Sequence, residues 1–407
     1  MNVVILTHTC PRFKGDQAAA FMKGLGNGFV AAGMQTWMLT PWDAQFQPDP
    51  ERHYQLITYR YIWPANWQIL GYSRTLVNDM SMKLSATLLA PFLIFFGILN
   101  LWRLVVREKI DVINAHWIVP NGFIGAIVSK LTGAKLVPTL QGSDVFLAQS
   151  NPLYGWMARV AAHQASAITT NSPQLGKDLV GLGADPTKIN PIMYGVDTNE
   201  IYPDQTGVAE KRKALGVAPT ELLILAVGRL VAKKGFHYLI QAMPEVIKNV
   251  PNAKCVIIGD GDQRAELEAL VAKHHLEGKV ILPGFATRNE IQILYNAADA
   301  FALPSIRDDA GNLDDQSVAL VEAMATGTPV IATKFPGYSI VIEDGKNGYL
   351  TNERDPTDIA RALIEILKDP NRRQVMGKRS LELIQTKFSW TRIAEQYKSL
   401  FERITRA

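Results

Sequence analysis

Residues 313–333 constrain the fold of this chain most, because a helix and a buried strand follow each other there without a long loop. The polar residues before Val318 and the apolar run after it predict a helix start. Gly327 marks the end of that helix, and residues 329–332 predict a buried strand. Asp314 and Glu322 lie eight positions apart, slightly more than two helical turns, which predicts that both carboxyl groups project from one side of the helix.

The same stretch has the composition of an anion-binding site. The free backbone N–H groups near Ser317 and Val318 and the dipole of the helix bind phosphate groups. The carboxylates of Asp314 and Glu322 accept hydrogen bonds from sugar or ribose hydroxyls. This combination suits a nucleotide-sugar diphosphate. The alternative interpretation is an ordinary capped helix followed by a strand.

The beginning of the chain predicts the opening of a Rossmann-like sheet. Residues 2–9 form an apolar run typical of a buried strand, residues 17–32 predict a helix, and residues 34–40 predict a second strand. The loop after the first strand contains Gly15 and lies where such folds bind anionic ligands. A simple turn is the alternative for this loop.

A second loop of this kind follows the strand predicted for residues 222–227. It begins at Gly228, carries Arg229 and Lys234, and leads into a helix predicted for residues 237–249. Two cations at a helix start neutralise a diphosphate and stabilise the charge that builds on it as a sugar leaves. Taken alone, such an Arg/Lys pair is usually solvated surface charge.

Together these motifs resemble retaining glycosyltransferase family 4, whose architecture is called GT-B. One motif is a carboxylate, seven residues and then Glu-Ala-Met-Ala-x-Gly-x-Pro-Val, and the other is Gly-Arg-Leu-x-x-x-Lys-Gly. The resemblance implies an α/β chain with two Rossmann-like domains facing across a cleft, and a sugar transfer with retention at the anomeric carbon. The chain has Asp314 where the family usually has Glu, Asp315 where Gly is frequent, and Ser317 where Pro or Gly is usual.

The resemblance also implies roles for individual residues. Arg229 and Lys234 would hold the leaving diphosphate, and Glu322 would accept from ribose hydroxyls. Asp314 would orient the donor sugar. His116, at the end of a predicted strand, would lie by the reacting carbon, with a purely structural histidine as the alternative. The other expected donor-binding positions are Gly15, Asp144, Gly228, Gly259, Gly261, Phe285, Ser317 and Val318.

Three positions of the first half depart from the family pattern. Asn114 stands two residues before His116, where the family often has another histidine. Gln141 replaces a histidine ahead of Gly-Ser-Asp, which removes an ionisable group from the predicted site. Tyr194 replaces an asparagine in the segment before the linker.

A chain of 407 residues fits two large domains. The expected N-terminal domain covers 1–203 and contains an apolar, mostly helical insertion at 62–108. The expected nucleotide-sugar domain covers 204–385, and a final helix at 386–407 returns to the first domain. The formal charge of +4, without a basic block, does not indicate nucleic acid. Cys10 and Cys255 lack metal-ligand spacing and predict buried thiols in a reducing compartment.

Residues 84–102 carry no charge and are long enough to span a membrane. Strands predicted before and after the segment belong to one sheet, however, and a single crossing would place them on opposite sides of the bilayer. The segment is then a buried core helix or an apolar surface that meets a membrane or a lipid-linked substrate, and the two are compatible. Three cations after it suit anionic headgroups and extend the expected peripheral membrane contact to 84–109: Arg103, Arg107 and Lys109.

These observations predict a cytoplasmic enzyme, peripheral on the inner face of the membrane. We expect a UDP-sugar donor, with GDP-mannose as the second candidate, and a lipid-linked or glycan acceptor in surface polysaccharide or glycolipid synthesis. No cofactor and no metal is expected, because Arg229 and Lys234 already serve the diphosphate. The alternatives are a non-catalytic sugar-nucleotide or membrane-binding subunit and a GT-B epimerase.

Overall fold

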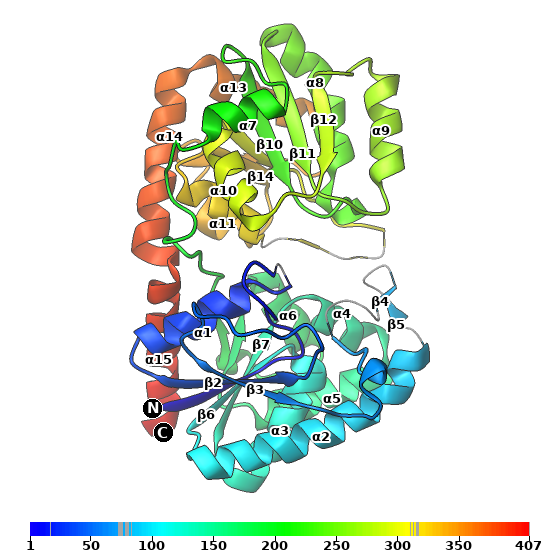
Figure 1. Ribbon diagram of the computed structural model, residues 1–407, viewed down its shortest axis with the longest axis vertical. Coiled ribbons are helices and arrows are strands. Elements are labelled where there is room, and N and C mark those ends of the chain that lie inside the picture. Colours follow the sequence, from blue (N-terminus) through cyan, green and yellow to red (C-terminus); the bar gives the residue numbers. More distant parts are fainter. Residues whose placement is uncertain are drawn as a thin grey trace. The chain divides into compact units, whose positions relative to one another are not determined.

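A computed structural model describes residues 1–406 except Gln17, 72–75, 78–80, Lys83, Ala310, Asn312 and 315–316; the side chains of 72–87 are outside this description. The chain forms two compact units (Figure 1). The N-terminal unit consists of Met1–Gly195 and Trp390–Ala407, and the C-terminal unit consists of Val196–Ser389. The two junctions lie a few residues from the limits expected at 203 and 386.

The N-terminal unit is built on a parallel sheet, which its described residues form with seven strands in the order β3-β2-β1-β6-β7-β8-β9. Its strands are nearly continuous apolar runs because helices cover both faces of the sheet. The strands are β1 (Asn2–Leu6), β2 (Gln35–Pro41), β3 (Gln55–Tyr59), β6 (Val112–His116), β7 (Lys135–Leu140), β8 (Ile168–Thr170) and β9 (Ile189–Pro191).

The helices of this unit divide between the two faces of the sheet (Figure 1). One face packs against α2, α3 and α5, and α1 and α15 pack together on the other. This is the arrangement that right-handed β–α–β crossovers produce. The helices are α1 (Phe21–Ala31), α2 (Leu84–Glu108), α3 (Phe123–Thr132), α4 (Ser143–Ser150), α5 (Pro152–Gln164), α6 (Pro173–Gly181) and α15 (Trp390–Arg406).

Two boundaries at the start of the chain differ from the prediction. The strand predicted for 2–9 ends at Leu6, because the Thr7 hydroxyl donates to the Thr9 carbonyl and also accepts from its N–H, closing a local turn. The helix predicted from residue 17 begins at Phe21. Asp16 accepts from the Ala18 N–H, and Ala19 has a positive φ of 49°. Residues 18–20 therefore form turns and not a helix.

The insertion predicted as mostly helical at 62–108 is helical mainly in its second part. The described residues of its first part form one short turn of helix at Ala65–Trp67 and a two-stranded antiparallel pair, β4 (Leu76–Val77) and β5 (Ser81–Met82). One side of α2 is buried in the unit through Leu93, Leu101 and Leu104, while other apolar side chains of the helix are exposed. The helix is thus both a core element and an apolar surface.

The last helix, α15, packs on α1 within the N-terminal unit. Phe29 of α1 lies 5.3 Å from Tyr397 and 5.7 Å from Phe401, measured between ring centroids. At the start of α15, the indole of Trp390 fits against Gly24, where a Cβ atom would lie 2.0 Å from its Nε1. The close packing of these helices therefore depends on a missing side chain in α1.

The C-terminal unit has a second parallel sheet, formed by its described residues in the order β12-β11-β10-β13-β14-β15. This sheet, with the first one, confirms the predicted pair of Rossmann-like domains. Its strands are β10 (Leu222–Val227), β11 (Ala253–Ile258), β12 (Val280–Gly284), β13 (Ala300–Leu303), β14 (Val330–Thr333) and β15 (Gly348–Thr351).

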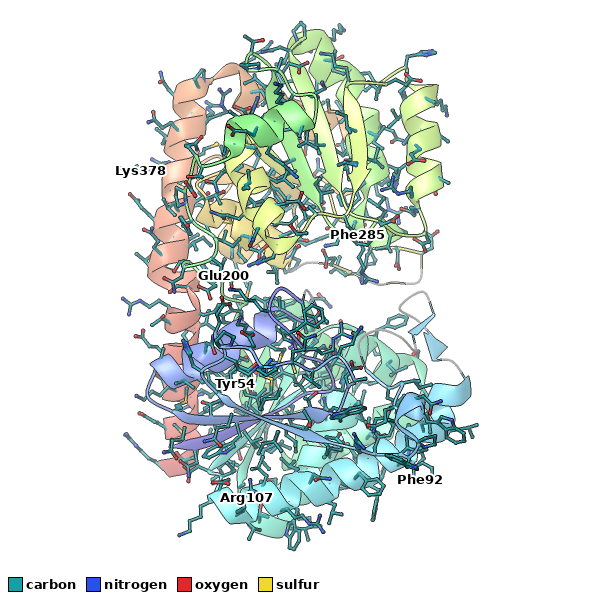
Figure 2. All side chains as sticks on the ribbon, in the orientation of Figure 1. Tyr54, Phe92, Arg107, Glu200, Phe285 and Lys378 are labelled. Atoms are coloured by element: carbon teal, nitrogen blue, oxygen red, sulfur yellow. The ribbon has the colours of Figure 1, made fainter. Side chains whose placement is uncertain are left out.

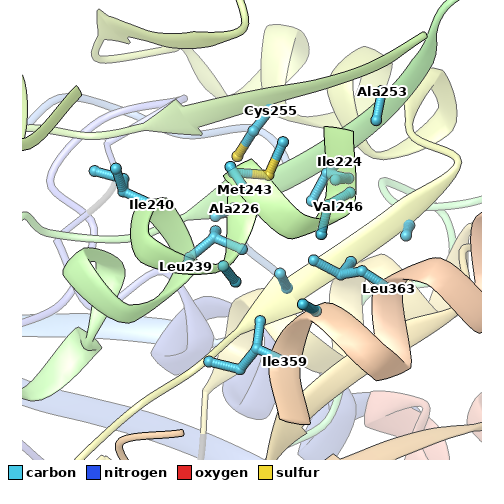
Figure 3. Close-up of a cluster of buried hydrophobic side chains, with 14 of the residues drawn as sticks. Ile224, Ala226, Leu239, Ile240, Met243, Val246, Ala253, Cys255, Ile359 and Leu363 are labelled. Atoms are coloured by element: carbon cyan, nitrogen blue, oxygen red, sulfur yellow. The ribbon is translucent and has the colours of Figure 1, made fainter. Parts of the chain in front are cut away.

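A large part of the core of this unit lies between the sheet and the helices α8 and α13. Figure 3 shows Leu239 and Met243 of α8 with Ile224 and Cys255 of the sheet and Leu363 of α13 in one buried cluster. The helices of the unit are α7 (Val208–Ala214), α8 (Phe236–Asn249), α9 (Arg264–Lys273), α10 (Arg288–Ala297), α11 (Val318–Ala325), α12 (Tyr338–Val341), α13 (Pro356–Lys368) and α14 (Pro370–Leu383).

We predict that Gly24→Ala destabilises the protein although alanine favours a helix. Its methyl group would meet the Trp390 indole, and overpacking of this kind costs about 1–3 kcal/mol, against a helix-propensity gain of about 1 kcal/mol. The matched control is Gly181→Ala in α6, where a Cβ meets nothing within 4 Å. Urea denaturation should give a lower unfolding free energy for the first variant only, and equal values for the two variants would contradict this packing.

Candidate functional site

A cation and a carboxylate meet in the C-terminal unit where two strands end. Lys234 follows β10 and its Nζ lies 2.7 Å from Oδ2 of Asp314, in the loop after β13. Both side chains are largely shielded, with 12% and 19% of their surface exposed. The same carboxylate oxygen accepts from the hydroxyls of Tyr338 (3.1 Å) and Ser305 (3.4 Å). Asp314 is thereby the centre of a polar cluster at the carboxyl edge of the sheet.

The electrostatics of this cluster keep Asp314 ionised. Burial alone would raise its pKa, but the ammonium groups of Lys234 and Lys233 and the hydrogen bonds from Lys234 and Tyr338 outweigh burial and lower the pKa below its ordinary value. The site thus presents a fixed negative charge beside a fixed positive one.

Glycines let the loops of this edge pack backbone to backbone. A Cβ on Gly259 would lie 1.9 Å from the Gly228 carbonyl oxygen, and one on Gly261 would lie 2.3 Å from that of Leu230. Gly235 has a φ of 64°, and a Cβ there would lie 2.0 Å from the Pro304 carbonyl oxygen. These glycines therefore hold the loop that carries Arg229 and Lys234 against its two neighbours.

Glu322 belongs to a different cluster from Asp314. It lies on α11, is 5% exposed, and its Oε1 is 2.5 Å from Nη1 of Arg288. Its Oε2 accepts from the Tyr295 hydroxyl at 3.0 Å. Burial would lower the pKa of Arg288, but the Glu322 carboxylate outweighs it and raises that pKa above its ordinary value.

The prediction that Asp314 and Glu322 project from one side of the same helix is wrong. Ser317 has an extended backbone, with φ −120° and ψ 126°, so α11 begins only at Val318 and Asp314 lies in the preceding loop. Asp315 and Gln316 are outside the described residues. Ser317 is buried at the cap position, and Val318 supplies the first helical N–H. Arg229 is exposed on its loop, and Phe285, just after β12, is 79% exposed.

In the N-terminal unit, Asp144 lies in the first turn of α4 and is 2% exposed. Its carboxylate accepts from the backbone N–H groups of Ile118, Gln141 and Gly142 at 2.6, 3.0 and 2.9 Å. Burial raises its pKa despite these bonds. Asp144 therefore fixes the loop after β7.

Gly15 lies in the loop between β1 and α1, with φ 87° and open space where a Cβ would be. The loop is closed by an ion pair, 2.6 Å long, between Nε of Arg12 and Oδ2 of Asp16. A glycine is needed here for the left-handed backbone rather than for a close approach within the unit.

His116 is the last residue of β6 and is 2% exposed. Its Nε2 lies 3.0 Å from Oδ1 of Asn114, and its Nδ1 lies 2.9 Å from Nε2 of Gln141. The Tyr194 hydroxyl donates in turn to Oε1 of Gln141. The three departures from the family pattern thus converge on the predicted histidine, and burial lowers the pKa of its ring to about 3.

His116 and Tyr194 also line a small pocket of the N-terminal unit, with room for about one water molecule. Phe21, Thr139, Asn171, Trp390 and Tyr397 also line it, and the Phe21 ring lies 4.9 Å from the Tyr194 ring. In the described part of the chain, no three His, Cys, Asp or Glu side chains group closely enough to hold a metal ion.

Sequence reasoning missed several partners of the predicted residues. Arg288 and Tyr295 on α10 donate hydrogen bonds to Glu322, and the Tyr338 hydroxyl donates one to Asp314. A capping box, in which Thr287 and Glu290 exchange hydrogen bonds, marks the start of α10 and could have placed Arg288 in its first turn. The tyrosine hydroxyls carry no such signal, because only the fold brings them to the carboxylates.

Two family models match the chain. The model described as glycosyl transferase 4-like domain covers residues 18–195, and the model described as glycosyl transferases group 1 covers residues 208–382. Each match lies within one of the two compact units.

Curated relatives agree with these matches. A putative colanic acid biosynthesis glycosyltransferase, WcaL of Escherichia coli K12, is 30% identical over 87% of this chain and 82% of its own length. A UDP-Gal:alpha-D-GlcNAc-diphosphoundecaprenol alpha-1,3-galactosyltransferase of Escherichia coli is 26% identical over 75% of this chain and 78% of its own length.

A solved structure is similar over the whole chain. HepE of Anabaena, in complex with UDP, has a TM-score of 0.73 at 20% identity and covers 99% of this chain and 100% of its own. At that identity the likeness concerns the fold.

We predict that burial of His116 makes the protein less stable as the pH falls. The ring has its ordinary pKa of 6.5 when unfolded and about 3 when folded, so between these values only the unfolded state binds the proton. The unfolding free energy should therefore fall from pH 6.5 downward, by up to about 1.4 kcal/mol per pH unit from this ring. Urea denaturation at several pH values should give a shallower dependence for His116→Asn, and an unchanged one for the exposed control His53→Asn. Identical slopes for wild type and His116→Asn would contradict the prediction.

Proposed function

Because the chain belongs to the family 4 glycosyltransferases of GT-B fold, we propose that it moves a sugar, with retention, from a nucleoside-diphosphate sugar to a hydroxyl acceptor. The observation that carries this proposal is the loop from Gly228 to Gly235, whose Lys234 lies beside Asp314 at the carboxyl edge of the second sheet. Open parallel sheets bind their ligands at this edge.

The residues of this edge have complementary roles in the proposal. Lys234 and Arg229 neutralise the diphosphate, and the backbone N–H groups near Ser317 and Val318 point to it from the start of α11. Asp314 accepts from hydroxyls of the donor sugar, and Glu322 accepts from ribose. Since both carboxylates are already paired within the protein, the donor must share or replace these partners when it binds.

The proposed chemistry needs no covalent intermediate and no metal. The bond between the anomeric carbon and the leaving phosphate breaks, the acceptor oxygen bonds to the same face of that carbon, and the acceptor proton passes to the leaving diphosphate. The cations stabilise the charge that develops on the leaving group.

A UDP-sugar is the favoured donor. HepE of Anabaena binds UDP, and the Escherichia coli galactosyltransferase takes its sugar from UDP-Gal. GDP-mannose is the second candidate, in line with the mannosyltransferase of Mycolicibacterium smegmatis that is 25% identical over 68% of this chain.

We predict that calorimetric titration with UDP, GDP and ADP gives tight binding of one nucleotide, in buffer that contains EDTA. Lys234→Ala should weaken that binding about 10- to 100-fold, the value of a hydrogen bond to a charged group. Glu322→Gln should weaken it as well, because the ribose loses a charged acceptor. A nuclear magnetic resonance spectrum of the product, once a donor is identified, should show the anomeric configuration of the donor.

The matched control is Lys248→Ala, which removes an exposed lysine near the other end of α8. It should leave the affinity unchanged. Failure of all three nucleotides to bind, or equal weakening by Lys248→Ala and Lys234→Ala, would overturn the assignment of the site. Binding that requires a divalent cation would overturn its metal-free character.

The acceptor in this proposal is lipid-linked, and the enzyme lies on the cytoplasmic face of a membrane. The Escherichia coli galactosyltransferase uses a diphosphoundecaprenol acceptor, which resides in a membrane. In this chain the surface suited to a membrane is α2, whose Leu88–Glu108 part is long and apolar enough to cross a bilayer by length and composition.

The exposed side of α2 carries an apolar stripe, defined as Leu88, Phe92, Phe95, Trp102 and Val106. These residues are spaced by helical repeats and are between 42% and 68% exposed, so one side of the helix presents apolar groups to solvent over about 27 Å. Only 28% of the apolar window of α2 is buried within the protein. Because α2 also packs against β1, β2 and β3, the helix lies on the unit and does not leave it to cross a bilayer.

The positive charges next to the apolar stripe indicate which kind of surface would cover it. Arg103 and Arg107 are exposed on the last turns of α2, and Lys109 follows directly (Figure 2 labels Phe92 and Arg107 on the outside of the helix). An amphipathic face with flanking cations suits an interface with anionic lipids.

We predict that the protein floats with liposomes containing an anionic phospholipid and not with purely zwitterionic ones. Phe92→Gln combined with Phe95→Gln should lower the partition constant by at least about tenfold. The reason is that full burial of one phenylalanine side chain contributes about 1.5–3 kcal/mol, and the double variant loses this contribution at two positions. Raised salt should also weaken binding.

The control for flotation is Val375→Gln, which changes an equally exposed apolar residue on α14 of the other unit. It should float like the wild type. Wild-type protein that remains unbound at low salt, or a double variant that floats fully, would exclude the apolar stripe as the membrane contact.

A further inference from the structure

The surroundings of His116 consist of uncharged hydrogen-bonding groups. Oδ1 of Asn114 forms a hydrogen bond with Nε2 of the ring, and Nε2 of Gln141 forms one with Nδ1. The Tyr194 hydroxyl forms a hydrogen bond with Oε1 of Gln141. The direction of the bond to Asn114 is fixed by the backbone, and the directions of the other two bonds follow from it when the ring is neutral.

The Asn114 amide has a fixed orientation. Its Nδ2 donates to the Val137 carbonyl at 3.0 Å and to the Thr139 hydroxyl at 2.9 Å. A carbonyl oxygen can only accept, so the Nδ2 group must face Val137 and Oδ1 must face His116. The proton between Asn114 and His116 therefore lies on Nε2 of the histidine.

The Gln141 amide completes the set from the other side. With the ring proton on Nε2, Nδ1 of the neutral ring is an acceptor, so Nε2 of Gln141 faces it and donates, and Oε1 of Gln141 accepts from the Tyr194 hydroxyl. Nδ1 can accept this bond only while it carries no proton. A positively charged ring would force the Gln141 amide to turn over and the Tyr194 hydroxyl to become an acceptor.

The titratable groups packed around His116 do not compete with these amides. The carboxylate of Asp144, on α4, accepts hydrogen bonds from three backbone N–H groups. His8, after β1, has its Nδ1 3.1 Å from Nδ2 of Asn121. Tyr397 of α15, which lines the same pocket, donates to the Thr169 hydroxyl. Both ring nitrogens of His116 thus have neutral amide partners.

We propose that Asn114 and Gln141 are positioning residues that hold His116 as a neutral imidazole with its proton on Nε2, and that Tyr194 sets the orientation of Gln141. The inference rests on the proposed sugar transfer and deepens it. With Nδ1 accepting and Nε2 donating, neither nitrogen is left to take the proton of the acceptor hydroxyl. His116 contributes a fixed neutral surface, and the acceptor proton leaves with the diphosphate.

The first test is nuclear magnetic resonance of the full-length protein with ¹⁵N-labelled histidine. The chain has seven histidines, and the His116 signals are identified by their loss in His116→Gln. They should report the Nε2–H form and should not titrate between pH 5.5 and 8. In Gln141→Glu, Nδ1 faces an acceptor, so the ring should gain a second proton and titrate in this range. In Tyr194→Phe the Gln141 amide can turn its Oε1 toward Nδ1 while Asn114 keeps the proton on Nε2, so the ring should accept a second proton at a higher pH than in the wild type.

The matched control is Gln164→Glu on α5, which introduces the same charge in the same unit and should leave the His116 signals unchanged. A wild-type ring that titrates near neutral pH, or that carries its proton on Nδ1, would overturn the proposal. So would a Gln141→Glu variant in which His116 stays neutral.

The second test is the pH dependence of the rate at which UDP is released from a UDP-sugar. If Gln141 had a merely structural role, its substitution would not change the shape of this pH profile. The wild type should have no inflection from His116 between pH 5.5 and 8, and Gln141→Glu should acquire one at the pH where its His116 signals titrate. An inflection in the wild type that His116→Gln removes would overturn the proposal. If the resonance results hold but no nucleotide sugar is turned over, the proposed function fails while the assignment of the His116 tautomer stands.

Discussion

Both units depend on the same constraint, which is that a parallel strand must be buried on both faces and must be followed by a crossover. Covering both faces makes the strands largely apolar, and the polar side chains that can meet a ligand lie where the strands end. Because all strands of a parallel sheet end at one edge, those groups are brought together there. His116 ends β6 and Gln141 follows the neighbouring strand β7, and Lys234 and Asp314 follow neighbouring strands β10 and β13. Within each unit, the polar cluster at the edge of the sheet is thus a consequence of topology before it is one of chemistry.

The polar groups at these edges are paired within the protein. Lys234 is bonded to Asp314, Glu322 to Arg288, and His116 to two amides. Leaving a buried charge without a partner is expensive, so pairing is the condition under which such groups can be held in shielded positions at all. A ligand with matching charges must therefore exchange partners with the protein. Binding at such a site is selective, since only a group that replaces the lost hydrogen bonds recovers their free energy.

The sequence predicted the elements well where local rules decide them. Residues 222–227 form a strand at the predicted position, and Gly327 ends α11 with the positive φ of 76° that glycine allows. Prediction failed where a tertiary contact decides. The extended backbone of Ser317 removes Asp314 from the helix, and Asp314 instead meets Lys234, eighty residues earlier in the chain. Tyr338 and Tyr295 were missed because a hydroxyl becomes a partner only after the fold has placed it.

The apolar helix α2 marks a different limit of sequence reasoning. Periodicity separates an apolar side from a polar one, but α2 is apolar nearly all round, so its sequence does not say which side the sheet covers. The structure divides it: Leu93, Leu101 and Leu104 are buried, whereas Phe92 and Phe95 are exposed. The core of the unit needs only the buried leucines. The exposed phenylalanines add nothing to that core and lower the solubility of the protein. The second set fits the membrane contact proposed above, because an apolar helix face with flanking arginines is favourable at a lipid surface.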